Sequence, residues 1–382
     1  MSEVHSADRI RGTLGELLPL KYGKSLPAAA RDASGSVPVF GSSGVVGQHS
    51  SALTSGPTII VGRKGNVGAV HFSAVPCWPI DTAYFVEPPA GHSAAYFRYL
   101  LTSLNLVRLD KSTAIPGLSR DDYNAVEVAI HHPAQQIEIV AEIEKQFSRL
   151  DEAVANLQRV KANLKCYKAA VLNDAVEGRL VESESSTELR KLGSVANLID
   201  PQPSHRTPAT HADGVPYIGI GDVLANGKLD FQNSRKVSQT VLEEHRARYT
   251  VRNGDFIFGK IGTLGRPTLL TPPFTYTLSA NVVLVQADGV RLLPEYALIF
   301  MDSPKLLNMI SRDAKATTQA AYGIKRMRDL EINIPHVEQQ RRIVAEVDRH
   351  LSIIREVEAE VDANLLRAQR LRQATLSKAF VR

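Results

Sequence analysis

Two long stretches of the chain have apolar residues recurring every three or four positions, which is the spacing of one face of an α-helix. The first stretch starts at Gln135 and the second at Gln339, and neither contains proline or glycine before it ends. About forty residues at a rise of 1.5 Å make a helix roughly 60 Å long. A helix of that length with one apolar stripe needs a matching apolar surface. We therefore predict two long helices that pack against each other as a coiled coil.

The two stretches are copies of one sequence. The letters "QQIEIVAEI" at Gln135 match "QQRRIVAEV" at Gln339, and the offset of 204 residues (339 less 135) needs no gap along the rest of the stretch. One such helix could be a coiled coil without a functional role. Two copies, each placed after a similar segment, favour a spacer between those segments. The apolar positions expected to form the helix contact are Ile143, Phe147, Leu150, Val154, Leu157 and Leu164 in the first helix and Val347, Leu351, Ile354, Val361 and Leu365 in the second.

The segments that precede the helices repeat as well. "VPVFGSSG" from Val37 resembles "VPYIGIGD" from Val215, and "AIPGLS" from Ala114 parallels "AAYGIK" from Ala320. Between these marks, "PTIIVG" and "GDFIFG" are typical of buried strands, whereas "AAYFRYLLTSLN" and "EYALIFMDSPKLLNMI" are typical of helices. Each globular segment is therefore predicted to be a mixed α/β domain.

The order of these parts predicts an α+β fold, in which two α/β domains are separated by two long antiparallel coiled-coil helices and related by a pseudo-two-fold internal repeat. The expected boundaries are 1–134 for the first domain, 135–180 for the first helix, 181–336 for the second domain and 337–382 for the second helix. The polar stretch "EGRLVESESSTELRK" has the composition of a linker at the start of the second domain.

A basic loop with glycine at every third position also occurs twice, as "GRKGNVG" from Gly62 and as "GKIGTLG" from Gly259. Glycines after a strand let the backbone turn sharply and approach a ligand, and cations between them suit a phosphate or a nucleic-acid backbone. The alternative is a glycine-rich β-turn whose cations are solvated. The candidate DNA-binding residues of the two loops are Arg63, Lys64, Asn66, Lys260, Thr263 and Arg266.

A third duplicated region mixes cations, hydroxyls and small residues just before the last strand of each domain. Such side chains can contact phosphates or base edges, although each could equally belong to a solvated connection. The candidate DNA-binding residues of this region are Lys111, Ser112, Thr113, Arg120, Lys315, Thr317, Thr318, Gln319, Lys325 and Arg326.

Composition adds little to this picture. A chain of 382 residues with 43% hydrophobic and 22% charged residues is typical of a soluble protein with more than one domain. The net charge of +5 is compatible with a polyanionic partner, but many proteins that bind no nucleic acid share it. The N-terminal sequence lacks the apolar core of a secretory signal, and no run of eighteen apolar residues occurs, so we expect a cytoplasmic protein without a membrane partner.

The search for catalytic or metal-binding motifs gives three weak matches and no metal site. The two cysteines and eleven histidines have no metal-ligand spacing. "YGKS" lacks the upstream glycine of a phosphate-binding P-loop. "TPPF" from Thr271 lacks the side-chain amide with which amino-methyltransferases hold adenine, and we interpret it as a proline turn between strands. "DAK" from Asp313 has an acid-x-lysine spacing found in nucleases, but three residues are a poor discriminator.

The repeated order of recognition segment and long helix resembles the specificity subunit of type I restriction-modification systems. The residues that carry the resemblance are "AIPGLS" with "HHPAQQIEIVAEI", and "AYGIKRMRDLEINIPHVEQQRRIVAEV", which look like the family's repeated entry into its spacer helices. The resemblance covers essentially the whole chain. Alternatives of another class are a self-sufficient DNA-modifying or cleaving enzyme, with "TPPF" and "DAK" in its site, and a coiled-coil scaffold that binds protein.

The resemblance implies two target recognition domains that each read half of a bipartite, asymmetric site in double-stranded DNA through the major groove. It implies antiparallel helices that set the distance between half-sites and dock two modification (methyltransferase) subunits. S-adenosylmethionine would be bound by those subunits, and ATP and Mg²⁺ by restriction (translocase and nuclease) subunits. The chain itself would hold no cofactor and catalyse no reaction. Two related domains on one duplex are best related by an approximate two-fold axis, which makes their helices antiparallel.

Overall fold

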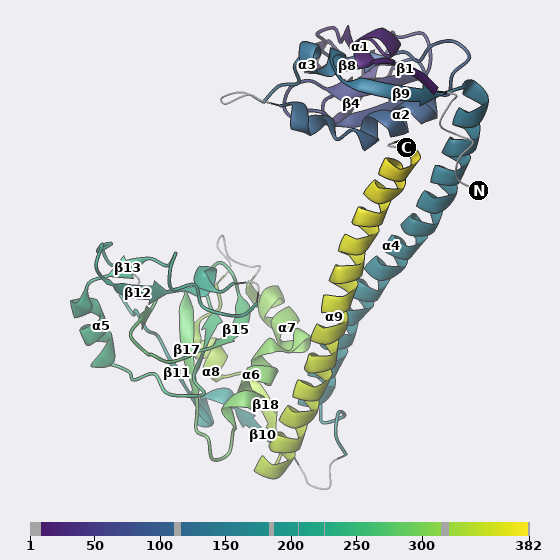
Figure 1. Cartoon of the computed structure of the whole chain (residues 1–382). Helices are drawn as coiled ribbons and strands as arrows, with labels where there is room; N and C mark the ends of the chain where they lie inside the picture. Colours follow the sequence, from purple (N-terminus) through teal and green to yellow (C-terminus); the bar gives the residue numbers. More distant parts are fainter. Residues whose placement is uncertain are drawn as a thin grey trace. The chain divides into compact units, whose positions relative to one another are not determined.

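The computed structural model describes residues 9–110, 116–182, 187–204, 206–224, 226–314 and 321–380. The chain divides into two compact units (Figure 1). Unit 1 comprises Met1–Gln158 and Asp362–Arg382, and unit 2 comprises Arg159–Val361. The boundaries of these units lie within the two long helices, α4 (Pro133–Val176) and α9 (Val337–Phe380). The domain limits predicted from the sequence repeat divide the chain differently and stay a prediction.

Unit 1 contains three small sheets, each with its own strand order. The first pairs β1 (Arg9–Thr13) with β9 (Glu127–His131), the second has the order β2 (Lys21–Tyr22), β8 (Ala83–Val86), β5 (Thr58–Gly62), β6 (Val70–Ser73), and the third has the order β4 (Gly44–His49), β3 (Val37–Gly41), β7 (Trp78–Pro79). Its short helices are α1 (Leu14–Leu17), α2 (Ala94–Ser103) and α3 (Arg120–Asn124), with 3₁₀ turns at Ala28–Ala30 and Leu106–Leu109.

Unit 2 contains the same three kinds of sheet. The first pairs β10 (Glu188–Lys191) with β18 (Glu331–Ile334), the second has the order β11 (Ala196–Ile199), β17 (Val282–Ala287), β14 (Phe256–Gly259), β15 (Gly265–Leu269), and the third has the order β13 (Lys236–Val237), β12 (Val215–Ile218), β16 (Thr277–Leu278). Its short helices are α5 (Gln239–Arg246), α6 (Pro294–Asp302), α7 (Pro304–Ala314) and α8 (Ile324–Arg328), with 3₁₀ turns at Leu192–Ser194 and Ile220–Asp222.

The two units therefore match strand for strand. In both, the third sheet joins one antiparallel and one parallel pair around a central strand, which is β3 in unit 1 and β12 in unit 2. These central strands start at Val37 and Val215, the two positions where the matching segments before the helices begin in the sequence. The predicted mixed α/β character is confirmed, and the sequence repeat is also a repeat of topology.

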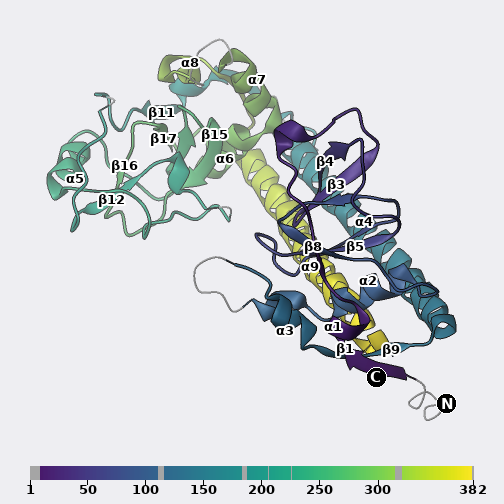
Figure 2. The same cartoon turned by 90° about the horizontal axis from the view of Figure 1, so that it is seen from above.

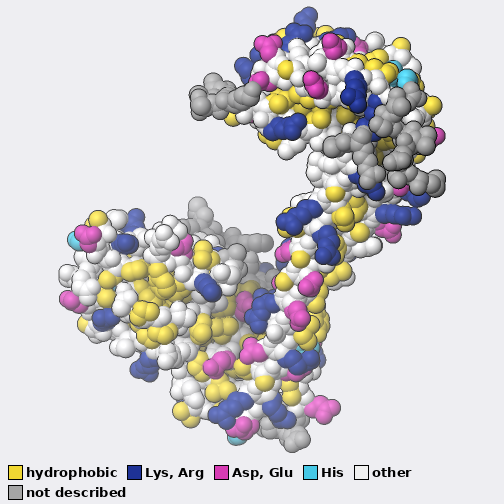
Figure 3. All heavy atoms as spheres, viewed as in Figure 1, with side chains coloured by type: hydrophobic (Ala, Val, Ile, Leu, Met, Phe, Trp, Pro, Cys, Tyr) yellow, Lys and Arg dark blue, Asp and Glu magenta, His cyan; other side chains and the backbone are white. Residues whose placement is uncertain are grey.

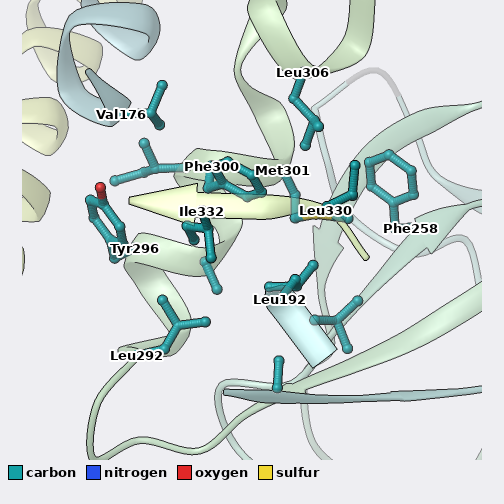
Figure 4. Close-up of a cluster of buried hydrophobic side chains, with 14 of the residues drawn as sticks. Val176, Leu192, Phe258, Leu292, Tyr296, Phe300, Met301, Leu306, Leu330 and Ile332 are labelled. Carbon is teal, nitrogen blue, oxygen red and sulfur yellow. The ribbon is translucent and has the colours of Figure 1, made fainter. Parts of the chain in front are cut away.

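Each unit has a core of its own that includes part of each long helix. In unit 2, the side chains of Val176 from α4, Phe300 from α6 and Phe258 from β14 gather around Ile332 of β18 (Figure 4). The side chain of Ile332 is fully buried, as an alternating strand with one face on a core requires. Because α4 supplies apolar side chains to this core, the long helix is anchored by tertiary packing rather than by helix propensity.

The two long helices lie side by side (Figures 1 and 2). In unit 1, the Thr375 hydroxyl donates a hydrogen bond to Oε1 of Gln146 at 3.1 Å, and Arg372 forms an ion pair with Asp151. In unit 2, Tyr167 and His350 share a hydrogen bond of 2.7 Å between the phenol oxygen and Nδ1. The number of the α9 partner falls as the number along α4 rises, so the paired helices are antiparallel.

The positions predicted for helix packing have the burial that such a contact needs. Ile143, Phe147, Val347, Ile354 and Val361 are buried, and the remaining six are half-buried. Phe147 lies in the core of unit 1 together with Leu376 and Phe380 of α9. Among the described helices, none is both long enough and apolar enough to cross a membrane.

Candidate nucleic-acid interface

Charge alone does not mark a binding surface on one face of this protein. On the face shown in Figure 3, Lys and Arg side chains are interspersed with Asp and Glu on both units and along the long helices. A candidate interface therefore has to be built from the local geometry of the duplicated loops and of the residues that contact them.

The backbone conformation of the two basic loops requires glycine, because a side chain would be strained or would clash. The loops connect β5 to β6 and β14 to β15, and Gly65 and Gly262 have φ angles of +78° and +74°, where side chains are rarely accommodated. A Cβ atom at Gly62 would lie 1.9 Å from the carbonyl oxygen of Asn66, and at Gly259 it would lie 2.1 Å from that of Thr263. The glycine spacing thus reflects a tight turn, and any DNA contact has to come from the side chains between the glycines.

Each basic loop is hydrogen-bonded to the third duplicated region of the same unit. In unit 1 the Leu118 amide donates to the carbonyl oxygen of Arg63 at 2.9 Å. In unit 2 the Tyr322 amide donates to the carbonyl oxygen of Lys260 at 2.9 Å. Arg63 and Lys260 therefore occupy equivalent positions, and the structure brings together two of the three segments that the sequence singles out.

In unit 1 this position belongs to an arginine–tyrosine cluster formed by Tyr22, Arg63 and Arg120. The guanidinium carbons of Arg63 and Arg120 lie 5.2 Å and 5.7 Å from the centroid of the Tyr22 ring, within the range of a cation–π interaction. Tyr22 remains 52% exposed, and Arg63 also donates from Nη1 to the carbonyl oxygen of Asp81 at 3.0 Å. Within the described part of the chain, neither arginine forms a salt bridge with a carboxylate.

The neighbouring loop residues Lys64 and Asn66 are exposed. Together with the arginine–tyrosine cluster they present cations, an amide and an aromatic ring on one exposed part of unit 1. Guanidinium groups stacked on an aromatic ring keep their planar donor edge available for phosphates or for a guanine edge. Sequence reasoning missed Tyr22, because its only signal was its place in the rejected "YGKS" match.

In unit 2 the equivalent cation is buried and paired. The Lys260 side chain is 4% exposed, and its Nζ lies 2.7 Å from Oδ2 of Asp200. This ion pair assigns the Lys260 charge to an interaction inside unit 2, so its proposed role as a phosphate contact finds no support in its surroundings. The sequence showed a cation in a glycine loop, but the carboxylate that neutralises it lies sixty residues away.

Four further candidates of unit 2 are exposed. Arg266 has a φ of +54° and donates from Nη2 to the carbonyl oxygens of Val223 and Leu224 at 2.9 and 3.2 Å, so part of its donor capacity is used within the unit. Thr263 is exposed in the loop itself, and the exposed side chains of Lys325 and Arg326 lie on α8. The candidates Lys111, Ser112, Thr113, Lys315, Thr317, Thr318 and Gln319 lie outside the described residues.

Each copy of the sequence repeat contains a buried glutamine whose structural role the sequence did not indicate. Gln136 and Gln340 are both fully buried at the start of the long helices. Oε1 of Gln136 accepts from the Ser93 amide, and Oε1 of Gln340 accepts from the Leu293 amide, each at 2.9 Å. The amide groups of both glutamines donate to backbone carbonyls, that of Gln136 to His131 at 2.7 Å. Each glutamine therefore joins its long helix to a shorter helix of the same unit, α2 in unit 1 and α6 in unit 2.

Replacing Gln340 with methionine is expected to destabilise unit 2 by about 2 kcal/mol, because the change removes the hydrogen bonds of Gln340 to the Leu293 amide and to the carbonyl oxygens of Arg291 and Pro335. Urea unfolding followed by hydrogen exchange of unit 2 peptides measures this. The matched control is Gln232→Met at an exposed position, which should change stability by less than about 0.5 kcal/mol. Equal stability of the two variants would contradict the role of Gln340.

Of the weak catalytic matches, "TPPF" lies wholly within the described residues, whereas Lys315 of "DAK" lies outside them. The "TPPF" segment lies between the end of β15 and the start of β16, and the Thr275 amide donates to the carbonyl oxygen of Pro273 at 2.8 Å. The predicted turn between strands is therefore confirmed. In the described ranges, no three His, Cys, Asp or Glu side chains gather in a way that could hold a metal ion.

Comparison with known proteins places this fold among restriction-modification proteins. Residues 184–364 match the family model of the type I restriction modification DNA specificity domain. The chain is 23% identical to the EcoBI specificity subunit of Escherichia coli, over 70% of this chain and 64% of that protein. It is 25% identical to the EcoKI specificity subunit of Escherichia coli strain K12, over 76% of this chain and 65% of that protein. The chain thus spans less than two thirds of the length of these two relatives.

Solved structures show the same fold at low identity. A chain from a structural study of complex assembly and conformational transition of the type I R-M system matches 98% of this chain and 97% of its own length, with a TM-score of 0.73 and 16% identity. The HsdS subunit from Thermoanaerobacter tengcongensis matches the same shares with a TM-score of 0.55 and 17% identity. The resemblance seen in the repeats is thereby confirmed: the chain is similar in sequence and fold to specificity subunits of type I restriction-modification systems, and its residues 184–364 match their DNA specificity domain.

Proposed function

We propose that this chain is the DNA sequence-specificity subunit of a type I restriction-modification complex, and that each unit contributes one target recognition domain that reads one half of a bipartite, asymmetric site. The observation that carries the proposal is the duplicated fold. Two units share their strand order and the contact between basic loop and third region, yet differ in the side chains placed there. A shared scaffold with different side chains is what two different half-sites on one duplex require.

The long helices are proposed to act as the spacer between the half-sites and as the docking surface for two modification subunits. Forty-four residues at 1.5 Å per residue make each helix roughly 66 Å long, whereas successive major-groove faces recur about every 34 Å. Antiparallel pairing of the helices supports a pseudo-two-fold arrangement of the two recognition domains, because a two-fold axis reverses the direction of a helix. The proposal includes the division of the chain into two recognition domains, 1–134 and 181–336, and two spacer helices, 135–180 and 337–382.

The proposed division of chemistry leaves this chain without catalysis. S-adenosylmethionine would be bound by the modification subunits, and ATP and Mg²⁺ by restriction subunits, if such a subunit assembles with them. The contribution of this chain is the choice of site. Its residues hold DNA in register through phosphate contacts and select bases through contacts in the groove.

The test combines binding and methylation. The purified full chain should bind a mixed-sequence 40-base-pair duplex with an affinity that falls steeply between 50 and 200 mM NaCl. Methyl transfer from S-adenosylmethionine to adenine should require added modification subunits, and methylated adenines mapped in cells should change when the chain is removed. Methyl transfer or DNA cleavage by the chain alone would identify it instead as a self-sufficient enzyme. Salt-independent binding, or none, would favour a scaffold for proteins.

A further inference from the structure

The strand registers define which residues of the two units are equivalent. Gly62 of β5 pairs with Ala83, and Gly259 of β14 pairs with Val282, so β8 and β17 can be superimposed from these pairs. In this superposition, Lys21 pairs with Phe85 of β8 where Ile199 pairs with Leu284 of β17. Lys21 and Ile199 are therefore equivalent. The residue that follows is Tyr22 in unit 1 and Asp200 in unit 2. The same place beside the basic loop therefore holds an aromatic ring in unit 1 and a carboxylate in unit 2.

This difference decides the charge that each loop presents. In unit 1, the Arg63 cation faces an exposed ring and keeps its full positive charge. In unit 2, the equivalent cation Lys260 is 3% exposed and pairs with Asp200 at 2.7 Å, so the pair is neutral as a whole. A neutral pair releases no counterions when DNA binds, because the number of condensed cations displaced follows the net charge brought to the phosphates.

The adjacent short helix shows the opposite change. Leu118 and Tyr322 are equivalent through their hydrogen bonds to the loops, so the residues three and four positions later are also equivalent. They are Asp121 and Asp122 on α3 in unit 1, and Lys325 and Arg326 on α8 in unit 2. Lys325 and Arg326 are both exposed, and Asp121 is exposed at the matching position. Two acidic positions of unit 1 are thus two basic positions of unit 2.

We propose that the two units contact the phosphates of DNA through different parts of their shared scaffold. Unit 1 uses the arginine–tyrosine cluster beside its glycine loop, and unit 2 uses the basic surface of α8, formed by Lys325 and Arg326. The proposal rests on the proposed function, since it assumes that both units bind one duplex. Its consequence is that matching positions of the repeat do not have matching roles. The residues that orient each half-site come from a loop, its neighbouring strand and the first residue of α3 in unit 1, and from α8 alone in unit 2.

Electrostatics supports this division in both units. Beyond Arg120, the first residue of α3, a phosphate placed against this helix of unit 1 would meet Asp121, which repels it, whereas a phosphate placed against α8 of unit 2 would meet two cations. Conversely, a phosphate at the glycine loop of unit 1 would meet Arg63 and Arg120, whereas at the loop of unit 2 it would have to break the buried Lys260–Asp200 pair.

The experiment measures the salt dependence of DNA binding for matched variants of the full chain. The probe is a fluorescein-labelled 40-base-pair duplex of mixed sequence, and its dissociation constant is measured by anisotropy between 50 and 200 mM NaCl. The first variant is Arg63→Gln with Arg120→Gln, and the second is Lys325→Gln with Arg326→Gln. Each should reduce the slope of log K against log salt by about 1.8, which is about 0.9 for each phosphate that the variant no longer neutralises.

Two controls separate phosphate binding from net charge and from unfolding. Asp200→Asn with Lys260→Gln replaces the buried ion pair by a neutral pair of similar size, and should leave the salt slope unchanged. Arg341→Gln with Arg349→Gln removes the same two charges from exposed pairs on α9, with Glu338 and Glu346, and should change the slope by less than about 0.5. Thermal unfolding of every variant confirms that binding is compared between folded proteins.

The outcomes are distinct. A wild-type chain without salt-dependent binding would refute the proposed function itself. If the wild type binds but the Asp200 and Lys260 double variant lowers the slope by about 1, the loop of unit 2 contacts phosphate and the inference is wrong. It is equally wrong if either of the first two variants keeps the wild-type slope.

Discussion

Replacing Lys260 with methionine is expected to lower the free energy of unfolding of unit 2 by about 3 kcal/mol, because the change leaves the Asp200 carboxylate beside an apolar side chain. Methionine keeps the length and most of the packing of the lysine stem, so the loss reports on the charge. Asp200 retains some exposure, 21% of its side chain, which places the expected value at the lower end for buried ion pairs. Urea unfolding with hydrogen exchange of unit 2 peptides gives the stability of this unit separately.

Two comparisons make this result specific. Arg63→Met changes the equivalent cation of unit 1, which pairs with no carboxylate among the described residues, and should change the stability of unit 1 by less than about 1 kcal/mol. Asp200→Asn combined with Lys260→Met removes the carboxylate charge that has lost its lysine partner and should recover part of the stability lost in Lys260→Met. A Lys260→Met variant as stable as the wild type would show that the pair contributes nothing to folding.

The long helices could be predicted from the sequence because their signal is local and long. An apolar residue every three or four positions, without proline or glycine, placed the helix starts at residues 135 and 339, and the helices begin at Pro133 and Val337. The first helix ends at Val176, and Gly178 follows with a φ of +73°, as a helix C-terminus often requires. The short strand β2, with two residues, carries no such periodic signal.

The candidate site was harder to predict, because its parts meet only through tertiary structure. Tyr22 reaches Arg63 through the pairing of β2 with β8, and Asp200 reaches Lys260 from beyond the end of β11. Their equivalence is invisible in an alignment of the chain with itself, since the offset between them is 178 residues (200 less 22), whereas the helices match at 204. Insertions between the repeated elements shift the offset along the chain, and only strand register restores the correspondence.

Burial also separated residues that sequence reasoning treated alike. Arg63, Lys64 and Lys260 are all cations between loop glycines. The sequences of the two loops do not distinguish a solvated cation from a buried one. The distinction depends on the strand that passes beside each loop. Burial likewise sets the role of Gln136 and Gln340, whose side chains bond backbone groups and, for Gln136, also Nδ1 of His92.

The stability of unit 2 is expected to fall by about 2 kcal/mol between pH 7.5 and pH 5 through the single side chain of His245. This imidazole is 1% exposed and contacts the Thr277 hydroxyl through Nδ1 and Oε1 of Gln202 through Nε2, each at 2.5 Å. A neutral ring that donates from Nε2 and accepts at Nδ1 satisfies both contacts. Burial in these surroundings lowers the pKa of His245 from 6.5 to about 4.

The direction of the pH effect follows from which state binds the proton. Below pH 6.5 the unfolded chain protonates this histidine, whereas the folded unit does so only near pH 4, so acidification favours the unfolded state across that interval. The loss reaches roughly 3 kcal/mol near pH 4 and then levels off. Burial raises the pKa of Asp222 and of Asp255 in the same unit, and these groups change stability in the opposite direction as pH falls.

The histidine contribution can be isolated with a His245→Gln variant. Glutamine can hydrogen-bond with Thr277 and Gln202 but does not titrate, so the carboxylates act equally in both proteins. Urea unfolding of unit 2 at pH 7.5, 6 and 5 should show the wild type more stable at pH 7.5 and its advantage shrinking by about 2 kcal/mol at pH 5. A difference between the two proteins that stays constant over this range would mean that His245 titrates alike in the folded and unfolded chain, and that its burial has no electrostatic consequence.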